Sequence, residues 1–158
     1  MIKKFIYIIS FCIISQLTLA AGSDSSSDSD SYLDKYKSAK NLVKRAKKLE
    51  TKGKTEKALK LYNSAYEELL EANKIESRNP DILNYLGFTL RKNGKLKEAE
   101  TYYLKGLKFD AGHIGINEYL GELYVETNRI DLAKERLAVL KGCKCEEYEE
   151  LKKIIENK

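Results

Sequence analysis

One segment of this chain returns 34 residues later in the same phase. Tyr85-Leu86-Gly87 is followed by Tyr119-Leu120-Gly121, and the same displacement relates Ala99 to Ala133. A 34-residue period with small and large apolar residues at fixed places is typical of stacked pairs of antiparallel helices. The sequence therefore predicts an all-α fold, a short solenoid that presents a continuous surface for binding.

The repeated glycines support the prediction of paired helices. Gly87 and Gly121 each lie within an apolar pattern at helical spacing. A glycine inside a helix costs about 1 kcal/mol relative to alanine, so two glycines in the same phase indicate that a second helix approaches closely. We expect Ala99 and Ala133 to make these close contacts, with Tyr103 filling the wider part of the first seam.

The pattern resembles the tetratricopeptide repeat, in which a bulky residue, Leu-Gly, aromatic residues, alanine and a small residue occupy fixed places in 34 positions. A central repeat that starts at Pro80 fits well, and a third repeat starting at Ile114 fits with a polar residue, Asn117, at the usual bulky place. The resemblance implies a right-handed α-solenoid that binds proteins. The signature packing residues are Leu86, Gly87, Ala99, Tyr103, Leu120, Gly121, Tyr124 and Ala133.

A weaker repeat precedes these two. Lys52-Gly53-Lys54 matches Asn93-Gly94-Lys95, which aligns Arg45-Ala46 with the Leu-Gly pair and preserves only half of that signature. The two turns lie 41 residues apart rather than 34, and a surplus of seven residues is close to two helical turns. We expect a long second helix from about Thr55 to Ile75, with a looped insertion as the alternative.

Apolar stripes and capping residues predict seven helices and no strands. The first helix is expected over residues 32–52, and Asn79 is expected to cap a helix that opens with Pro80. A last helix over 146–157 has an apolar face suited to covering the end of a solenoid. The predicted domain spans residues 32–158, with repeats over 39–79, 80–113 and 114–145.

The first 20 residues differ from the rest of the chain. Lys3 and Lys4 precede an apolar run from Phe5 to Leu19, and Thr18-Leu19-Ala20 suits a signal peptidase. The run is shorter than the roughly 20 apolar residues that span a bilayer. We expect a signal peptide of residues 1–20 cleaved after Ala20 or Ala21, export to a bacterial periplasm, and no stable membrane insertion afterwards; an uncleaved anchor is the alternative. Residues 21–31, rich in serine and aspartate, are expected to form a flexible linker.

Composition argues against several classes of partner and activity. Removal of residues 1–20 leaves 27 basic against 24 acidic side chains, and a net charge of +3 is too small to indicate nucleic acid or a membrane surface as a partner. The linker aspartates lack the spacing of a calcium loop. The sequence has no phosphate-binding loop, nucleophile elbow or metalloprotease histidine pair. We therefore predict no enzyme activity, no cofactor and no metal.

Cys143 and Cys145 are the cysteines that remain after removal of the signal peptide. In an oxidising compartment two cysteines are usually paired, and a bridge here would fix the turn between the third repeat and the last helix. Intermolecular pairing, free thiols and a zinc or copper site, which would need further ligands, are the alternatives.

The resemblance to tetratricopeptide proteins also implies a concave groove lined by the first helix of each repeat. Four places in each of these helices, spaced three and four apart, share one helical face. They are Lys40, Val43, Lys47 and Glu50 in the first repeat, Asp81, Asn84, Phe88 and Arg91 in the second, and Gly115, Glu118, Glu122 and Val125 in the third. The first set is basic and the third acidic, so a partner segment of opposite polarity would fit. Phe88 is either an apolar anchor for the partner or a packing residue between first helices.

Together these observations predict a non-enzymatic adaptor of the bacterial envelope that holds a segment of another envelope protein. One alternative is a thiol-active accessory factor that uses Cys143 and Cys145. The other is a scaffold that forms homo-oligomers by stacking solenoids end to end.

Overall fold

The computed structural model describes residues 25–158. Within these residues there are seven α-helices and no strands, which confirms the all-α prediction. The expected signal peptide (1–20) and the first part of the expected linker (21–24) lie outside the described residues. The helices are α1 (Ser25–Glu50), α2 (Thr55–Ile75), α3 (Pro80–Lys92), α4 (Leu96–Leu107), α5 (Ile114–Glu126), α6 (Ile130–Leu140) and α7 (Glu146–Glu156).

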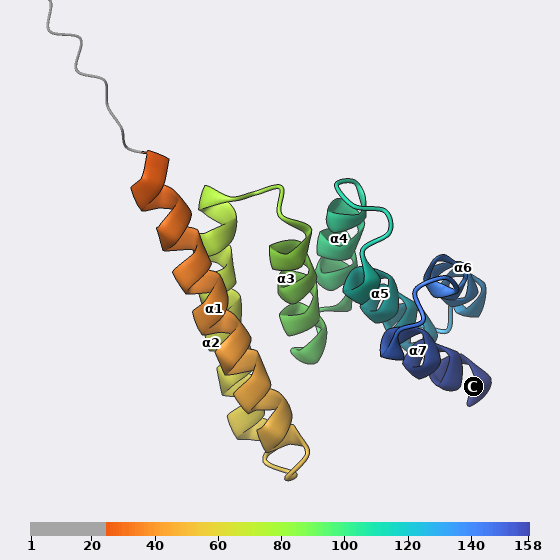
Figure 1. Ribbon diagram of the computed structural model, residues 1–158. Coiled ribbons are helices and arrows are strands. Elements are labelled where there is room, and N and C mark those ends of the chain that lie inside the picture. The colour runs from red at the N-terminus through yellow and green to blue at the C-terminus, as the bar shows by residue number, and fades with distance from the viewer. Residues whose placement is uncertain (1–24) are drawn as a thin grey trace, which may run out of the picture.

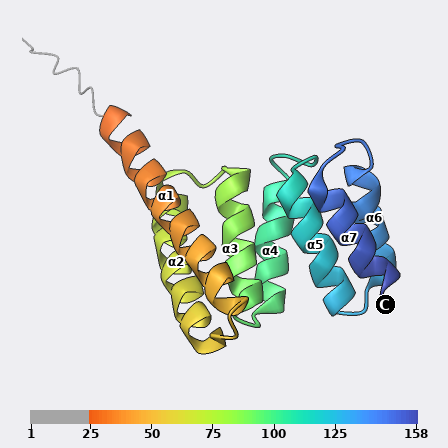
Figure 2. The same cartoon turned by 60° about the horizontal axis from the view of Figure 1, so that its bottom comes forward.

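Three helix pairs stack in chain order from one end of the molecule to the other (Figure 1). α1 packs along α2, α3 along α4, and α5 along α6, while α7 lies against both α5 and α6. Successive pairs are joined by contacts between α2 and α3 and between α4 and α5 (Figure 2). This is a solenoid of helix hairpins with an added helix at its end. No helix within residues 25–158 has the length and apolar character needed to cross a membrane.

The first helix begins earlier than the sequence indicated. α1 starts at Ser25, so residues 25–31, which were expected to belong to a flexible linker, are helical. Once a helix has formed, each further residue adds a backbone hydrogen bond without a new nucleation cost. Serine and aspartate have only moderately poor helix propensities, so the helix that packs against α2 extends upstream through them.

The surplus of seven residues in the first repeat lengthens its helices rather than forming a loop. α2 runs without a break for 21 residues, whereas α3 to α7 have between 11 and 13. Two added turns keep the apolar face in phase, because the buried residues of α2 recur at spacings of three and four. These residues are Ala58, Tyr62, Ala65, Leu69 and Ala72.

The turns inside the three hairpins share one backbone feature. Gly53, Gly94 and Asn128 occupy the same place in each hairpin and have φ of 69°, 74° and 60°. A positive φ reverses the chain after a helix, and glycine and asparagine adopt it at the lowest cost. At the start of α3, the backbone N–H of Ile82 donates to Asn79 Oδ1 over 3.2 Å, which makes Asn79 the expected cap.

Both repeated glycines lie at close approaches, but their partners differ from those expected. A Cβ added to Gly87 would lie 2.5 Å from Cε1 of Tyr103 in α4, and one added to Gly121 would lie 2.5 Å from Cδ2 of Leu151 in α7. The expected partners Ala99 and Ala133 are buried but are not the nearest atoms. A long side chain reaches across the bare glycine backbone, whereas a methyl group does not extend that far.

Candidate functional site

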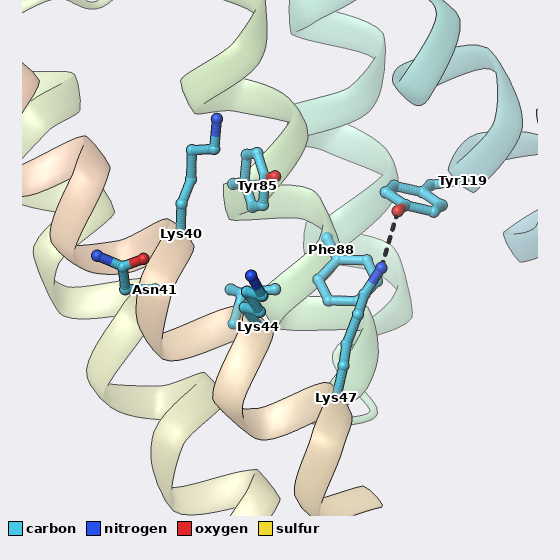
Figure 3. Close-up of a pocket in the computed structure, with 8 residues that line it drawn as sticks. Lys40, Asn41, Lys44, Lys47, Tyr85, Phe88 and Tyr119 are labelled. Carbon is cyan, nitrogen blue, oxygen red and sulfur yellow. Dashed lines mark hydrogen bonds between the residues drawn. The ribbon is translucent and has the colours of Figure 1, made fainter. Parts of the chain in front are cut away.

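Side chains of α1, α3 and α5 meet around a cavity of about 330 Å³ (Figure 3). α1 contributes three lysines at helical spacing, and the other two helices contribute aromatic rings. The cavity therefore combines positive charge with an aromatic surface. Its lining consists of Lys40, Asn41, Val43, Lys44, Lys47, Tyr85, Phe88 and Tyr119.

Phe88 forms the buried base of this cavity. Its side chain is 2% exposed, and its ring centroid lies 5.8 Å from that of Tyr62 and 4.9 Å from that of Tyr119. Aromatic pairs at such separations stabilise each other beyond the effect of buried area. Phe88 thus packs between helices and forms part of the cavity wall, while its role as an anchor for a partner stays a prediction.

The three lysines line the cavity, and Lys47 lies against its aromatic base. Lys47 Nζ donates to Tyr119 Oη over 3.1 Å and lies 4.7 Å from the Phe88 ring centroid, a cation–π distance. Within residues 31–158, no carboxylate forms an ion pair with Lys40, Lys44 or Lys47. Their charges are therefore available to an acidic group from outside.

A second cavity, of about 540 Å³, adjoins the first and shares the side chains of Lys40, Tyr85 and Tyr119 with it. Its remaining lining is rich in carboxylates. They are Asp81, Asp110, Glu118 and Glu147. The two cavities therefore form one groove that is basic at α1 and acidic towards α5 and α7.

Glu118 is the most buried carboxyl group at the acidic end, with 3% of its surface exposed. Burial raises its pKa to about 9, and a hydrogen bond with Glu150 and the negative charges of Glu122 and Glu147 act in the same direction. Burial and these neighbours therefore favour the protonated form of Glu118. The uncharged carboxyl group can lie between α5 and α7 without the cost of a buried charge.

Several predicted groove residues are engaged inside the fold. Glu50 accepts hydrogen bonds from Tyr62 Oη at 2.9 Å and Lys92 Nζ at 3.0 Å. Burial alone would raise the pKa of Glu50, but the hydrogen bonds from Lys92 and Tyr62 outweigh it and lower this pKa. Arg91 forms ion pairs with Glu122 and Glu126 across α3 and α5. These side chains hold neighbouring helices together.

The structure thus divides the predicted groove residues into three groups. Lys40, Val43, Lys47 and Phe88 line the basic cavity, and Lys40, Asp81, Asn84, Gly115 and Glu118 line the acidic cavity. The others, Glu50, Arg91, Glu122 and Val125, line neither of these two cavities. Val125 is 3% exposed and belongs to the apolar core.

Tyr85 and Tyr119 line both cavities, and the predicted groove set omitted them. The signal that identifies them is the repeated tripeptide itself, because each is the tyrosine of a Tyr-Leu-Gly unit. The leucine and glycine face the packed interior, while the tyrosine lies on the neighbouring side of the helix, towards the groove.

His113 has a structural role at the start of α5. Its Nδ1 accepts a hydrogen bond from the backbone N–H of Ile116 at 3.1 Å, and its Nε2 lies 3.2 Å from Asp81 Oδ1. Both ring nitrogens are therefore engaged, as helix cap and as donor to a carboxylate. Within residues 25–158, no three acidic, histidine or cysteine side chains are placed to hold a metal ion.

Cys143 and Cys145 form a disulfide in the loop between α6 and α7, with their Cα atoms 5.2 Å apart. The intervening Lys144 has a φ of 52°, a left-handed conformation that closes the short ring. The bridge lies directly before the first turn of α7.

The chain is similar to one known domain family in part of its sequence and to solved tetratricopeptide domains in its fold. A family model of the MIT (microtubule interacting and transport) domain matches residues 36–88, about a third of the chain. This segment holds α2 and most of α1, where the 34-residue signature is weakest, together with most of α3. No curated protein matches the chain in sequence.

Solved structures of tetratricopeptide domains superpose on most of the chain. The Arabidopsis OM64 domain is 13% identical with a TM-score of 0.52, and 78% of this chain and 98% of that one are covered. The Yersinia enterocolitica type III secretion chaperone SycD, in complex with a peptide of the translocator YopD, is 16% identical with a TM-score of 0.53, and the coverage is 75% and 86%.

The second tetratricopeptide domain of human RPAP3, in complex with an HSP70 peptide, is 17% identical with a TM-score of 0.53. The match covers 80% of this chain and 99% of that domain. At such identities the similarity establishes the architecture and leaves the ligand of this chain open. The chain has the helix-hairpin solenoid fold of tetratricopeptide domains.

Proposed function

We propose that this protein is a non-enzymatic adaptor that holds a segment of another protein against α1, α3 and α5. The observation that carries this proposal is the set of three α1 lysines, Lys40, Lys44 and Lys47, which line a cavity with aromatic rings and form no ion pair with a carboxylate of residues 31–158. Carboxylates of a bound segment would pair with the lysines. An apolar side chain of the same segment would contact Tyr85, and together these contacts would exclude water from the cavity.

The similar structures support a role in peptide binding. SycD is described in complex with a peptide of the translocator YopD, and the second RPAP3 domain in complex with the HSP70 peptide SGPTIEEVD. These ligands belong to those proteins. Their relevance here is that the same arrangement of helices offers a concave surface to an extended chain.

We place this adaptor in the bacterial envelope, with another envelope protein as its partner. The support comes from residues 1–20, where two lysines, an apolar run and Thr18-Leu19-Ala20 follow the order of a secretory signal. In that setting a disulfide between Cys143 and Cys145 would persist, because the periplasm is oxidising.

The test is peptide binding measured by fluorescence anisotropy. The probe is an end-blocked peptide with four glutamates and one phenylalanine, and its scrambled lysine-for-glutamate version is the control. We expect the acidic peptide to bind at least ten times more tightly than the basic one. We also expect Lys44→Glu/Lys47→Glu to weaken binding at least tenfold, because both reversed charges line the cavity.

Lys57→Glu/Lys60→Glu is the matched control, because it makes the same change in net charge on the exposed face of α2. It should alter the affinity by less than twofold at 0.15 M salt, where separated surface charges are largely screened. Equal losses in the two double variants would mean that only the overall charge attracts the peptide. That result would contradict the groove assignment.

A further inference from the structure

Asn84 is an unusual residue for the wall of a cavity. It belongs to α3, only 6% of its surface is exposed, and its Oδ1 accepts no hydrogen bond from any described residue. Its amide lies against the backbone of Gly115, where an added Cβ would be 2.7 Å from Asn84 Nδ2. The glycine thus leaves room for the amide. A buried acceptor without a donor is destabilising, so it needs an explanation.

The same cavity is strongly acidic. Glu118, 3% exposed, and Glu147 lie on its wall with Asp81 and Asp110. Glu122 on α5 and Glu150 on α7 add negative charge next to Glu118. The groups that oppose this charge are Lys40 of α1 and, when protonated, His113 beside Asp81. Tyr36, Tyr85 and Tyr119 complete the titratable lining.

We propose that this cavity is a subsite for a basic side chain, a guanidinium or ammonium group carried by the segment that the groove binds. Asn84 Oδ1 has less than 1 Å² of exposed surface in the free chain, so the amide would turn towards the cavity and accept an N–H of the ligand. The charge of the ligand would lie beside Glu118 and Glu147. The inference deepens the proposed function, on which it rests for the source of the cation. Arginine fits best, because its planar fork donates to an amide and a carboxylate at the same time.

Binding of the cation has a consequence for the proton of Glu118. In the free protein, burial and three neighbouring carboxylates favour the uncharged form of Glu118. A positive charge beside Glu118 favours its ionised form. One cation therefore enters as up to one proton leaves to solvent, and the charge of the buried site is unchanged. Binding should release protons at pH 7.5 and should tighten as the pH rises towards 9.

The test compares two end-blocked peptides by isothermal titration calorimetry with the full chain. Both carry the glutamates and phenylalanine of the probe described above, followed by a Gly-Ser spacer and either arginine or its uncharged analogue citrulline. Titration at pH 7.5 in phosphate and in Tris gives the number of protons released. We expect the arginine peptide to bind at least five times more tightly and to release between about 0.5 and 1 proton, and the citrulline peptide to release none.

Glu118→Gln keeps the shape of the side chain and removes the acid, so it should abolish both the preference for arginine and the proton release. The matched control is Glu149→Gln, an exposed residue of α7 outside this cavity, which should preserve both. Far-UV circular dichroism checks that each variant is folded. Asn84→Leu, which removes the acceptor, should reduce the preference for arginine at least threefold.

A third probe separates failure of the subsite from failure of the groove. N-acetylarginine amide, added alone at millimolar concentration, should shift the side-chain amide resonance of Asn84 in a ¹H–¹⁵N spectrum. If neither peptide binds but this shift occurs, the proposed function is overturned and the subsite stands. If both peptides bind equally well and the arginine amide causes no shift, the subsite is overturned and the groove stands.

Discussion

The guanidinium of Arg91 in α3 pairs with the carboxylate of Glu122 in α5, and both side chains are largely buried, with 11% and 17% exposed. The pair joins two successive first helices of the solenoid beside the groove. Arg91 lies 3.8 Å from Glu126 as well, and its charge faces the ring of Tyr119, whose centroid is 5.9 Å away. Arg91 therefore joins two successive repeats and also contacts Tyr119, a residue of the groove wall.

Removing one partner of this pair should be costly. We expect Arg91→Met to lower the free energy of unfolding by about 3 kcal/mol, because Glu122 would remain partly buried without a counter-charge. Arg91→Met/Glu122→Met should recover most of this loss, since no uncompensated charge remains. Urea denaturation of the two variants and the wild type measures both effects. A double variant as unstable as the single one would show that the arginine acts through packing alone.

The two repeated glycines should respond differently to alanine. At Gly87 the new Cβ meets the ring of Tyr103, which is fully buried and cannot move aside. We expect Gly87→Ala to destabilise the protein by about 1–3 kcal/mol. At Gly121 the contact is the flexible end of Leu151, which is buried as well but belongs to the terminal helix α7. This helix packs against α5 and α6 only, so it can shift, and the gain in helix propensity of about 1 kcal/mol offsets the overlap.

Gly121→Ala should therefore change stability by less than about 1 kcal/mol. Thermal denaturation followed at 222 nm compares the two variants. Equal destabilisation at Gly87 and Gly121 would mean that α7 is held as rigidly as α4.

The buried carboxyl of Glu118 should make stability depend on pH. Burial and the neighbouring carboxylates raise its pKa from 4.5 to about 9 in the folded chain, so the native state binds a proton that the unfolded state has lost. Between these values the native state holds more protons, and this contribution to stability therefore falls as the pH rises. It is fully present below pH 4.5 and is lost as the pH passes 9.

Glu118→Gln removes this dependence. The unfolding free energy of the variant minus that of the wild type should therefore increase steadily from pH 5.5 to 7.0 to 8.5, as measured by urea denaturation. The comparison at each pH cancels the titration of all other groups. A difference that stays constant with pH would show that Glu118 is ionised in the folded protein.

The oxidation state of Cys143 and Cys145 distinguishes an adaptor from a thiol-active factor. Because the two sulfur atoms are bonded in the structure, we expect titration with Ellman's reagent in denaturant to detect no thiol in the oxidised mature protein, and two after reduction. Cys143→Ser/Cys145→Ser should lower the unfolding free energy by only about 1–2 kcal/mol, since the closed loop is very short. Free, fast-reacting thiols in the purified protein would instead support the thiol-active factor.

If the protein is exported, removal of the signal peptide sets the N-terminus of the mature chain. When the full chain is expressed with a functional secretion system, intact mass spectrometry of the periplasmic fraction should find a protein that begins at Ala21 or Gly22. Ala20→Arg/Ala21→Arg should leave the precursor uncleaved, because signal peptidase requires small residues there. Recovery of the full-length wild-type chain in the cytosol would contradict the envelope setting.

The sequence alone allowed the helices to be predicted because their signals are local. Positive φ at Gly53 and Gly94, the cap at Asn79 and the stripe along Thr55–Ile75 all act within a few residues, where spacing determines which face is apolar. The start of α1 at Ser25 could not be predicted this way. Serine and aspartate are common in linkers, and only the adjoining helix makes them helical.

The candidate site was predicted less completely, because helical spacing selects a face but not its surroundings. Lys40 and Lys47 share that face with Glu50, yet Glu50 is occupied by Tyr62 and Lys92, which lie on other helices. Tyr85 and Tyr119, absent from the predicted set, line the groove because each lies on the side of its helix next to the buried Leu-Gly pair.

The 34-residue period thus determined that this chain is a stack of helix hairpins, since apolar spacing along a helix is a property of the sequence itself. The tertiary structure decided which charges remain available. It paired Arg91 with Glu122, left Lys40, Lys44 and Lys47 without an ion pair to any carboxylate of residues 31–158, and buried Glu118 in the cavity that Asn84 also lines. Electrostatic partners and burial depend on residues distant in the chain, so they are established only when the repeats pack.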